Sequence, residues 1–334
     1  TRSRWGHLDS YIAPREAQDM DAPAILAFNA LLVLCTLPAF FVAKVAGWAS
    51  CVRPLRPDSF RRRAVIVVTC LGWRLLRVLC WWITPEVEGL AEFQKSLGAS
   101  GRPAIIVANH TSFLDSILMV PYTPLDRIVR LKMYVSSHLM KIPVLRTLLD
   151  VMGFIVVPFT KSDDPESFAV DRPLMEARQQ EFEAHVRAGG IAAWFPVGRM
   201  HVGDDKLAVG PFRAGGFELA VRVDVEIWCV AFVGNSTCWP RLATLGGRPA
   251  KIRAKFSKLC DSSWGALESE GAGRENEKDA SALLANLARD SVQASVRDLA
   301  AKPGAACGGP PSARRPGALG PEQHVQHLYL SSGW

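Results

Sequence analysis

A histidine and an aspartate five residues apart give the strongest chemical signal in this sequence. They lie in the segment Asn109–Asp115, which reads NHTSFLD and directly follows the apolar run Pro103–Ala108. Attack of an alcohol on a thioester needs a base that removes the hydroxyl proton, and neutral imidazole suits this task near pH 7. A carboxylate on the other ring nitrogen would fix the tautomer and stabilise the imidazolium. His110 and Asp115 therefore predict acyl transfer in which the substrate's own hydroxyl is the nucleophile.

The same pair also has a purely structural interpretation. A histidine at the start of a helix with a capping carboxylate would give this spacing without any catalysis, and a single His–Asp pair is a weak motif. Two positions five apart on an ideal helix do not face each other. We therefore expect His110 to lie in the turn between the preceding strand and the following helix, where Asp115 can fold back toward it.

Three sequence blocks, in order, resemble the glycerophospholipid acyltransferase family, which includes glycerol-3-phosphate and 1-acylglycerol-3-phosphate acyltransferases. NHTSFLD is similar to the first block. Lys132, followed by Ile142-Pro143 and Gly153–Val157, is similar to the second. Phe195–Gly198 and then Gly210–Gly215 resemble the third, which is usually written FPEGTR and FKxG. The resemblance runs from Pro103 to near Trp239. It implies acyl-CoA as co-substrate, no metal or bound cofactor, and lysophosphatidate or a related lysophospholipid as acceptor.

The resemblance also implies which residues form the site. His110 would be the general base and Asp115 its orienting partner. A positive pocket would suit the phosphates of CoA or of a lysophospholipid, although each of its cations could equally be a solvated surface charge. The substrate-binding set implied by position in the blocks is Asn109, Lys132, Lys161, Gly198, Arg199 and Arg213.

Two departures from the family pattern leave a second interpretation open. The glutamate expected in the third block is Val197, and the Thr-Arg pair that should follow the glycine is Arg199-Met200. Pro158 stands near the place where the second block usually ends in arginine, with Lys161 as the nearest cation. The alternative to an active enzyme is therefore a catalytically weakened or inactive protein that binds lipid or CoA on the same fold. From composition alone, an unrelated basic protein at the membrane surface is a third interpretation.

Composition agrees with an anionic partner and an apolar surface. The chain is 49% hydrophobic and 21% charged, with a net charge of +7 and a mean hydropathy of +0.11. Basic proteins attract nucleic acid, anionic lipid or phosphate-bearing substrates, but the aromatic residues do not interleave with the basic ones as in a nucleic-acid platform. The eight cysteines form no CxxC motif and no metal-ligand spacing, so we expect reduced thiols and no metal site. Because the chain begins at Thr1, we expect further residues to precede it.

Two apolar stretches near the N-terminus are expected to associate with a bilayer. Residues 22–43 hold no charged side chain, and this stretch is long enough to span a hydrocarbon core of roughly 30 Å. The alternative is that it forms a buried core helix. Residues 64–83 contain Arg74 and Arg77, which would be costly at mid-bilayer, so we expect an amphipathic helix in the interface. A basic connector joins the two. One crossing keeps the later domain in the cytosol with acyl-CoA, at the endoplasmic reticulum or a plastid membrane.

From about residue 85 the pattern becomes an alternation of strands and helices. Apolar runs predict strands at 103–108, 151–157, 191–196 and 225–233, with an edge strand at 251–256. Helices are expected at 110–120, 173–188, 215–223 and 281–299. The predicted fold is α/β, a mixed, partly parallel sheet flanked by helices and preceded by N-terminal membrane-associated helices. The predicted organisation is a polar segment (1–21), membrane-associated helices (22–84), an acyltransferase domain (85–262), a helical region (263–300) and a disordered tail (301–334).

Overall fold

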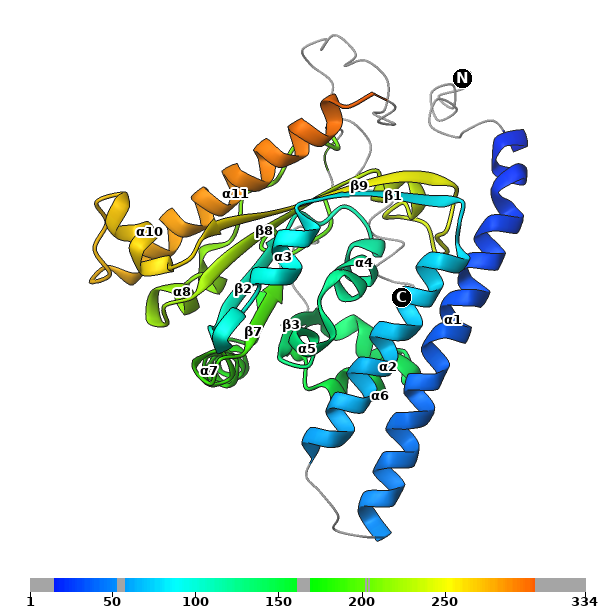
Figure 1. Ribbon diagram of the computed structural model, residues 1–334, viewed down its shortest axis with the longest axis horizontal. Helices are drawn as coiled ribbons and strands as arrows, with labels where there is room; N and C mark the ends of the chain where they lie inside the picture. The colour runs from blue at the N-terminus through cyan, green and yellow to red at the C-terminus, as the bar shows by residue number, and fades with distance from the viewer. Residues whose placement is uncertain (1–14, 53–57, 161–168, 202, 204, 304–334) are drawn as a thin grey trace, which may run out of the picture.

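A seven-stranded sheet with helices on both faces, and a pair of long helices beside it, make up the molecule (Figure 1). The computed structural model describes residues 15–52, 58–160, 169–201, 203 and 205–303. Most of the predicted tail (301–334) and most of the polar segment (1–21) therefore lie outside the described residues. The fold class expected from the sequence, a mixed sheet flanked by helices, is confirmed.

The strand order is β1-β9-β8-β2-β7-β3-β4. Five neighbouring strands, from β8 to β4, run parallel, whereas β9 is antiparallel to β8 and parallel to β1. The bounds are β1 Ile83–Glu88, β2 Ala104–Ala108, β3 Leu131–Ser136, β4 Ile155–Val157, β7 Ile191–Trp194, β8 Glu226–Val233 and β9 Ala250–Cys260. A separate pair, β5 Phe159–Thr160 and β6 Ala169–Val170, is antiparallel.

Alternate residues of each central strand face two different cores. Ile106 of β2 belongs to the core under the N-terminal helices, and Ile105 and Val107 belong to the core on the other face. This follows from the twofold side-chain alternation of a strand. The first face is covered by α3 Leu90–Ser96, α4 Leu114–Tyr122, α5 Leu125–Ile128 and α6 Pro143–Met152; the second by α7 Arg172–Arg187, α8 Glu218–Arg222, α10 Ser263–Ser269 and α11 Glu277–Ala301.

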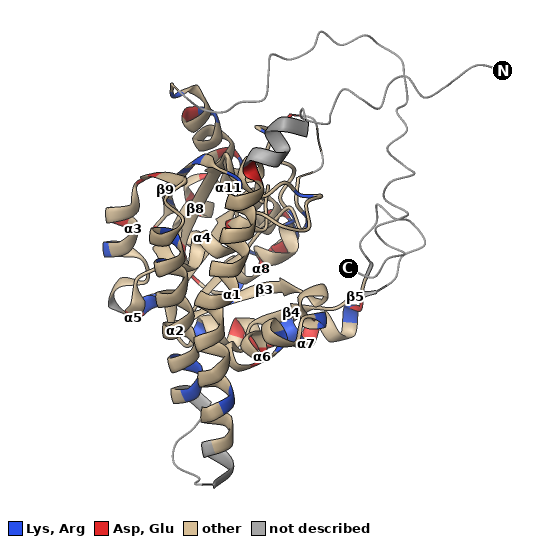
Figure 2. Ribbon diagram, turned by 90° about the vertical axis from the view of Figure 1, so that its right-hand side faces the viewer, with Lys and Arg blue, Asp and Glu red and all other residues tan. Residues whose placement is uncertain are grey.

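The two N-terminal helices pack side by side as a hairpin (Figures 1 and 2). Helix α1 spans Arg15–Val52 and α2 spans Asp58–Leu79, so much of the expected connector is helical. Within α1, Asp21–Trp48 is long and apolar enough to cross a membrane by length and composition. Both helices also contact α6. The hairpin is therefore packed onto the α/β domain, and its division into one crossing helix and one interfacial helix stays a prediction.

Two arginines of α2, Arg62 and Arg74, face the domain. Arg74 donates from Nε to the carbonyl oxygen of Pro121 and from Nη2 to that of Thr123, both at 3.0 Å. Arg62 donates to the carbonyl oxygens of Met152, Val129 and Leu131. The last carbonyls of a helix lack intrahelical partners and carry partial negative charge, so these arginines satisfy the carboxyl ends of α4 and α6. Their place in an apolar sequence thus has a structural reason.

Several predicted elements differ in extent from the observed ones. Residues 251–256 were expected at an edge, but β9 lies between β1 and β8. Strand β1 occupies that edge instead and was not predicted, nor was β3. Val151 and Met152 end α6 and are not part of a strand. Helix α4 begins at Leu114 and not at His110. Helix α11 packs on β8 and shares a hydrophobic core with the sheet. The division into a domain at 85–262 and a helical region at 263–300 stays a prediction.

Candidate active site

Three loops meet at one edge of the sheet. Strand β2 pairs in parallel with β7 on one side and with β8 on the other, so the carboxyl ends of all three strands lie at the same edge. The segments that follow them are residues 109–115, 195–201 and 234–239. Sites in open α/β sheets form where such loops leave the carboxyl ends of strands.

His110 and Asp115 are in contact at the carboxyl ends of these strands. The Nδ1 atom of His110 lies 3.1 Å from Oδ2 of Asp115, and the Asp115 side chain is completely buried. His110 precedes the first turn of α4, as the spacing argument required. Because Nδ1 faces the carboxylate, Nε2 is the ring atom left to exchange a proton with a substrate.

The backbone around Asp115 holds its carboxylate in place. The amide groups of Thr111 and Ser112 donate to Oδ2 at 2.7 and 2.9 Å. On the other side, Nδ2 of Asn235 donates to Oδ1 at 2.5 Å. A buried carboxylate is stable as an anion only when hydrogen bonds replace its lost hydration. All four contacts, including the one to His110, serve that purpose.

The loop after β7 covers one face of the imidazole. The ring of Phe195 stacks on that of His110, with centroids 4.1 Å apart and planes inclined by 13°. The backbone amide of His201 donates to the carbonyl oxygen of His110 at 2.8 Å. These contacts fix both the plane of the ring and the path of the third-block loop beside it.

Gly198, Arg199 and Arg213 come together in this loop. Gly198 has a φ of +78°, and a Cβ there would lie 2.9 Å from Nε of Arg213. The amide of Arg213 donates to the carbonyl oxygen of Pro196. Arg199 is exposed directly after the glycine. A glycine with an arginine folded against it can present both backbone and guanidinium to an anion.

The other three predicted binding residues are not brought into this arrangement. Both amide atoms of Asn109 bond to the backbone of Phe232, at 2.9 and 2.8 Å, so its side chain joins β2 to β8 and the geometry does not favour a substrate contact. Lys132 pairs with Glu181 at 2.9 Å. Lys161 lies outside the described residues.

Lys132 stands at the opposite end of the sheet from His110. It is level with Ala192 of β7, as is Ile105 of β2. His110 follows Ile105 by five residues, which is about 16 Å along the strand direction at ~3.3 Å per residue. The expected positive pocket therefore cannot include Lys132 in this conformation, because strand β3 enters the sheet with the lysine at its amino end.

Two residues that the sequence argument missed complete the site. Phe195 is part of the third block, but nothing in its position shows that its ring stacks on the histidine. Asn235 follows the long buried strand β8 after a single glycine. A polar residue directly after a buried parallel strand was the available signal. No group of three or more His, Cys, Asp or Glu side chains is arranged for a metal ion in the part of the chain that is described.

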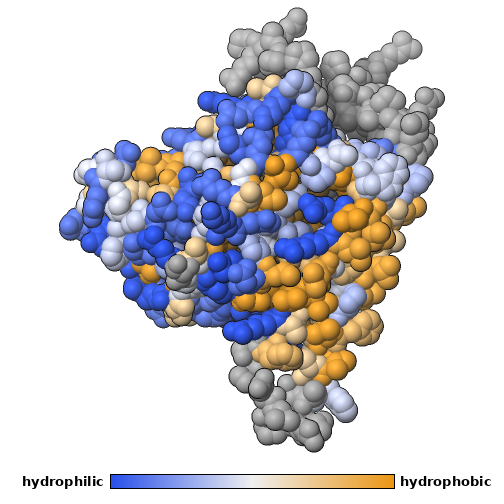
Figure 3. Space-filling model, in the orientation of Figure 1, coloured by the Kyte–Doolittle hydropathy of each residue, from blue (hydrophilic) through white to orange (hydrophobic). Residues whose placement is uncertain are grey.

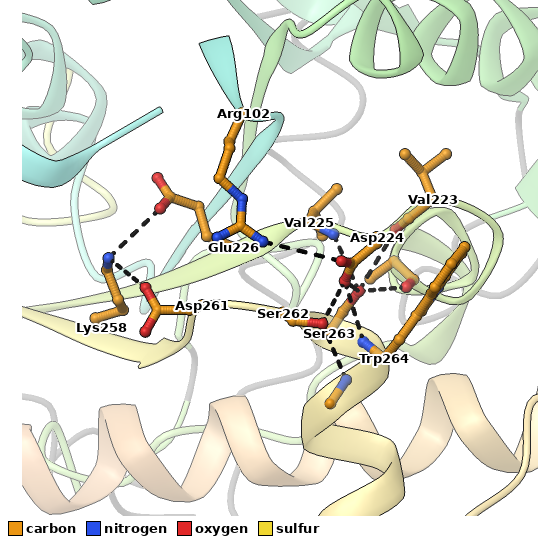
Figure 4. Close-up of polar contacts among 12 residues, drawn as sticks. Arg102, Val223, Asp224, Val225, Glu226, Lys258, Asp261, Ser262, Ser263 and Trp264 are labelled. Carbon is orange, nitrogen blue, oxygen red and sulfur yellow. Dashed lines mark hydrogen bonds and ion pairs between the residues drawn. The ribbon is translucent and has the colours of Figure 1, made fainter. Parts of the chain in front are cut away.

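A second polar cluster lies at the amino ends of the strands, away from the catalytic dyad of His110 and Asp115. Asp224 accepts from Oγ of Ser262 at 2.7 Å and from the amide of Trp264 at 3.3 Å. Lys258 lies between Asp261 and the buried Glu226. Figure 4 shows these contacts joining the start of β8 to the end of β9 and to α10. Since Glu226 is level with Ala104 at the start of β2, this cluster stabilises the fold and does not reach His110.

An apolar cleft lies between the hairpin and α4. The cleft is narrow, with a cavity volume of about 20 Å³. Leu114 lines it and is the residue directly before Asp115, so one end of the cleft adjoins the catalytic segment. The other lining residues are Phe28, Trp73, Leu76, Arg77, Cys80, Ile83, Pro85, Ile117, Leu118 and Pro121.

Comparison with known proteins agrees with the fold. Residues 84–233 match the family model described as Acyltransferase, and these residues hold every element of the site except the loop after β8. They form an acyltransferase domain. The family model, the curated relatives and the shared fold together support a place for this domain in the glycerophospholipid acyltransferase family.

Two curated relatives are chloroplastic 1-acyl-sn-glycerol-3-phosphate acyltransferases. The Brassica napus protein is 27% identical over 183 residues, covering 55% of this chain and 46% of its own length. The Arabidopsis thaliana protein is 27% identical over 155 residues, covering 46% of this chain and 37% of its own. The chain thus spans less than half of either relative. The crystal structure of the 1-acyl-sn-glycerophosphate acyltransferase from Thermotoga maritima has the same fold, with a TM-score of 0.60 at 18% identity, over 86% of this chain and 98% of that one.

Proposed function

We propose that this protein transfers the acyl group of acyl-CoA to lysophosphatidate or a related lysophospholipid. The observation that carries the proposal is the contact between His110 and the buried carboxylate of Asp115 at the edge of the sheet. The relatives named as 1-acyl-sn-glycerol-3-phosphate acyltransferases support the choice of acceptor.

The proposed reaction uses the imidazole twice. Nε2 of His110 takes the proton of the acceptor hydroxyl as its oxygen attacks the thioester carbonyl carbon. The resulting tetrahedral intermediate collapses with cleavage of the C–S bond, and the same nitrogen returns the proton to the leaving CoA sulfur. Asp115 stabilises the imidazolium between these steps. The ester and free CoA are the products, so no further reactant is needed.

The apolar side chains that line the narrow cleft beside Leu114 suit a hydrocarbon chain, and the cleft would have to widen to admit one. Burying a methylene group stabilises a complex by about 0.8 kcal/mol, so a cleft of this kind favours a hydrocarbon chain over a polar ligand. Its end at the residue before Asp115 would place a chain's carbonyl or glycerol end toward the dyad.

Arg213 is expected to bind the acceptor phosphate. Changing Arg213 to Gln should raise KM for lysophosphatidate about tenfold with little change in kcat, because a charge-assisted contact to a dianion is lost. The same change at Lys132 is the matched control and should leave KM within about twofold, since Lys132 stands at the other end of the sheet. Steady-state kinetics on both variants give the measurement. If KM rose equally in the Arg213 and Lys132 variants, Arg213 would not be the residue that binds the acceptor phosphate.

The alternative function is binding without turnover. Val197 occupies the place of the family's glutamate and packs partly buried beside Gly210, where a Cβ would lie 3.2 Å from its side chain. Release of CoA thiol from acyl-CoA, measured with a panel of lysolipid acceptors, separates the two functions. If no acceptor gives more release than buffer while vesicles carrying lysolipid still bind the protein, the binding function is correct.

The hairpin is proposed to attach the protein to a bilayer. One side of α1 and α2 exposes large apolar side chains, which form a continuous patch in Figure 3, and Lys and Arg residues gather on its projecting end (Figure 2). Exposed apolar area of this extent marks a membrane or protein contact. The residues include Leu26, Val33, Leu34, Phe41, Val45, Phe60, Leu71, Leu75 and Val78.

Replacing Leu34, Phe41 and Val78 together with serine should weaken partition of the protein into vesicles about tenfold, because three apolar side chains no longer enter the lipid. Flotation with phosphatidylcholine–phosphatidylglycerol vesicles measures the bound fraction. Leu174→Ser is the control, since Leu174 is exposed on α7 and not on the hairpin. An unchanged bound fraction in the triple variant would remove the hairpin from membrane attachment. For the organelle, the chloroplastic relatives favour a plastid membrane over the endoplasmic reticulum.

A further inference from the structure

We propose that Asn235 is a positioning residue of the reaction, which holds the Asp115 carboxylate in its orientation toward His110. The inference rests on the proposed function for its catalytic part. Its structural part, the contact between an amide and a buried carboxylate, stands on the geometry alone: Nδ2 of Asn235 lies 2.5 Å from Oδ1 of Asp115, and both side chains are completely buried.

Asn235 supplies the only side-chain donor to Oδ1 of Asp115 among the described contacts. The other three donors, the amides of Thr111 and Ser112 and the ring of His110, all converge on Oδ2. Without the amide, one carboxylate oxygen would be buried with no partner. Such an oxygen is costly as part of an anion, so the carboxylate would rotate or take up a proton, and either change weakens its hold on the imidazole.

The chain places this amide through two other contacts. Asn109 bonds in both directions to the backbone of Phe232, which fastens the end of β8 beside the segment that carries His110. Gly234 then turns the chain with a φ of +90°, and a Cβ at that position would lie 2.3 Å from the carbonyl oxygen of Lys251. Only glycine fits this turn. Asn109 and Gly234 together therefore bring residue 235 back to the dyad.

The orientation of the amide points to a role beyond packing. Oδ1 of Asn235 is buried with no hydrogen-bond partner among the described residues. The reverse orientation would set that oxygen against the Asp115 carboxylate, which is repulsive. The side chain thus leaves its own acceptor unsatisfied in order to donate to Asp115, an arrangement typical of functional sites.

Two substitutions of opposite character test the proposal. Asn235→Ala should lower kcat for acyl transfer 10- to 100-fold with KM within about threefold. Asn235→Asp, which has the same shape, should lower kcat further, because it sets a second carboxylate against Asp115. If Asn235 served packing alone, Asn235→Asp would instead lower kcat less than Asn235→Ala. In the Asp115→Asn background, Asn235→Ala should change kcat less than threefold, since residues that act through one another are not additive.

Unfolding provides a readout that needs no activity. At pH 8 the Asn235→Asp protein should unfold at lower denaturant concentration than Asn235→Ala, and the gap should narrow as the pH is lowered, because a proton shared by two adjacent carboxylates removes their repulsion. Asn235→Ser, which keeps a donor, serves if the alanine variant does not fold and should retain more activity than the aspartate variant. If wild type consumes no thioester but the pH-dependent gap appears, the proposed function fails and the contact stands. If wild type is active and the aspartate variant equals or exceeds the alanine variant in kcat, the positioning role is wrong.

Discussion

Replacing His110 with alanine is expected to lower acyl transfer by about three orders of magnitude, in the middle of the range for loss of a general base. The physical reason is that no other group then takes the acceptor's proton as the C–O bond forms. The fold should persist, because the His110 ring is partly exposed and stacks on Phe195 at the carboxyl ends of the strands, outside the core. Release of CoA thiol and a thermal melt measure the two quantities.

His138→Ala is the matched control for this prediction. His138 is exposed in the short helix after β3, and its loss should leave turnover within about twofold. A His110→Ala protein that keeps a tenth or more of the wild-type rate would exclude the imidazole as the base. If wild type and His110→Ala are equally idle with every acceptor while lipid binding persists, the protein is a binding protein on this fold.

Replacing Asp115 with asparagine should lower turnover by two to four orders of magnitude and reduce the free energy of unfolding by about 1–3 kcal/mol. The neutral amide cannot stabilise the imidazolium. It also cannot accept from every surrounding donor: if its oxygen faces Thr111 and Ser112, its amino group meets that of Asn235. Both losses follow from the same buried geometry.

Asp224→Asn separates the two effects. Asp224 also accepts several hydrogen bonds, from Ser262 and Trp264 among others, but it lies at the amino ends of the strands (Figure 4). This variant should lose stability and keep the turnover of the folded protein near wild type. If Asp115→Asn behaved like Asp224→Asn, with lower stability but normal turnover, then Asp115 would only cap the turn before α4.

Arg74 in α2 illustrates how context changes the meaning of a sequence pattern. Arg74 in an apolar run is costly if it faces lipid, and this cost led to the prediction of a separate interfacial helix. In the structure Arg74 turns inward to the carbonyls of Pro121 and Thr123. The composition of a helix shows how much of it is apolar, but which side meets lipid depends on what packs against the other side.

The sequence by itself determined the dyad and the fold class. His110 and Asp115 are close in the chain and follow a buried strand, so their meeting needs one local turn, and the strand–helix alternation needs only the periodicity of apolar residues. Only the tertiary structure decided the rest of the site. Asn235 meets Asp115 across 120 positions, and Lys132 is separated from His110 because β3 pairs with β7 in one particular register. The same order of strands makes β9 an inner strand. Such contacts depend on which strands become neighbours and at what register, and this is set by the packing of the whole sheet and not by any short segment.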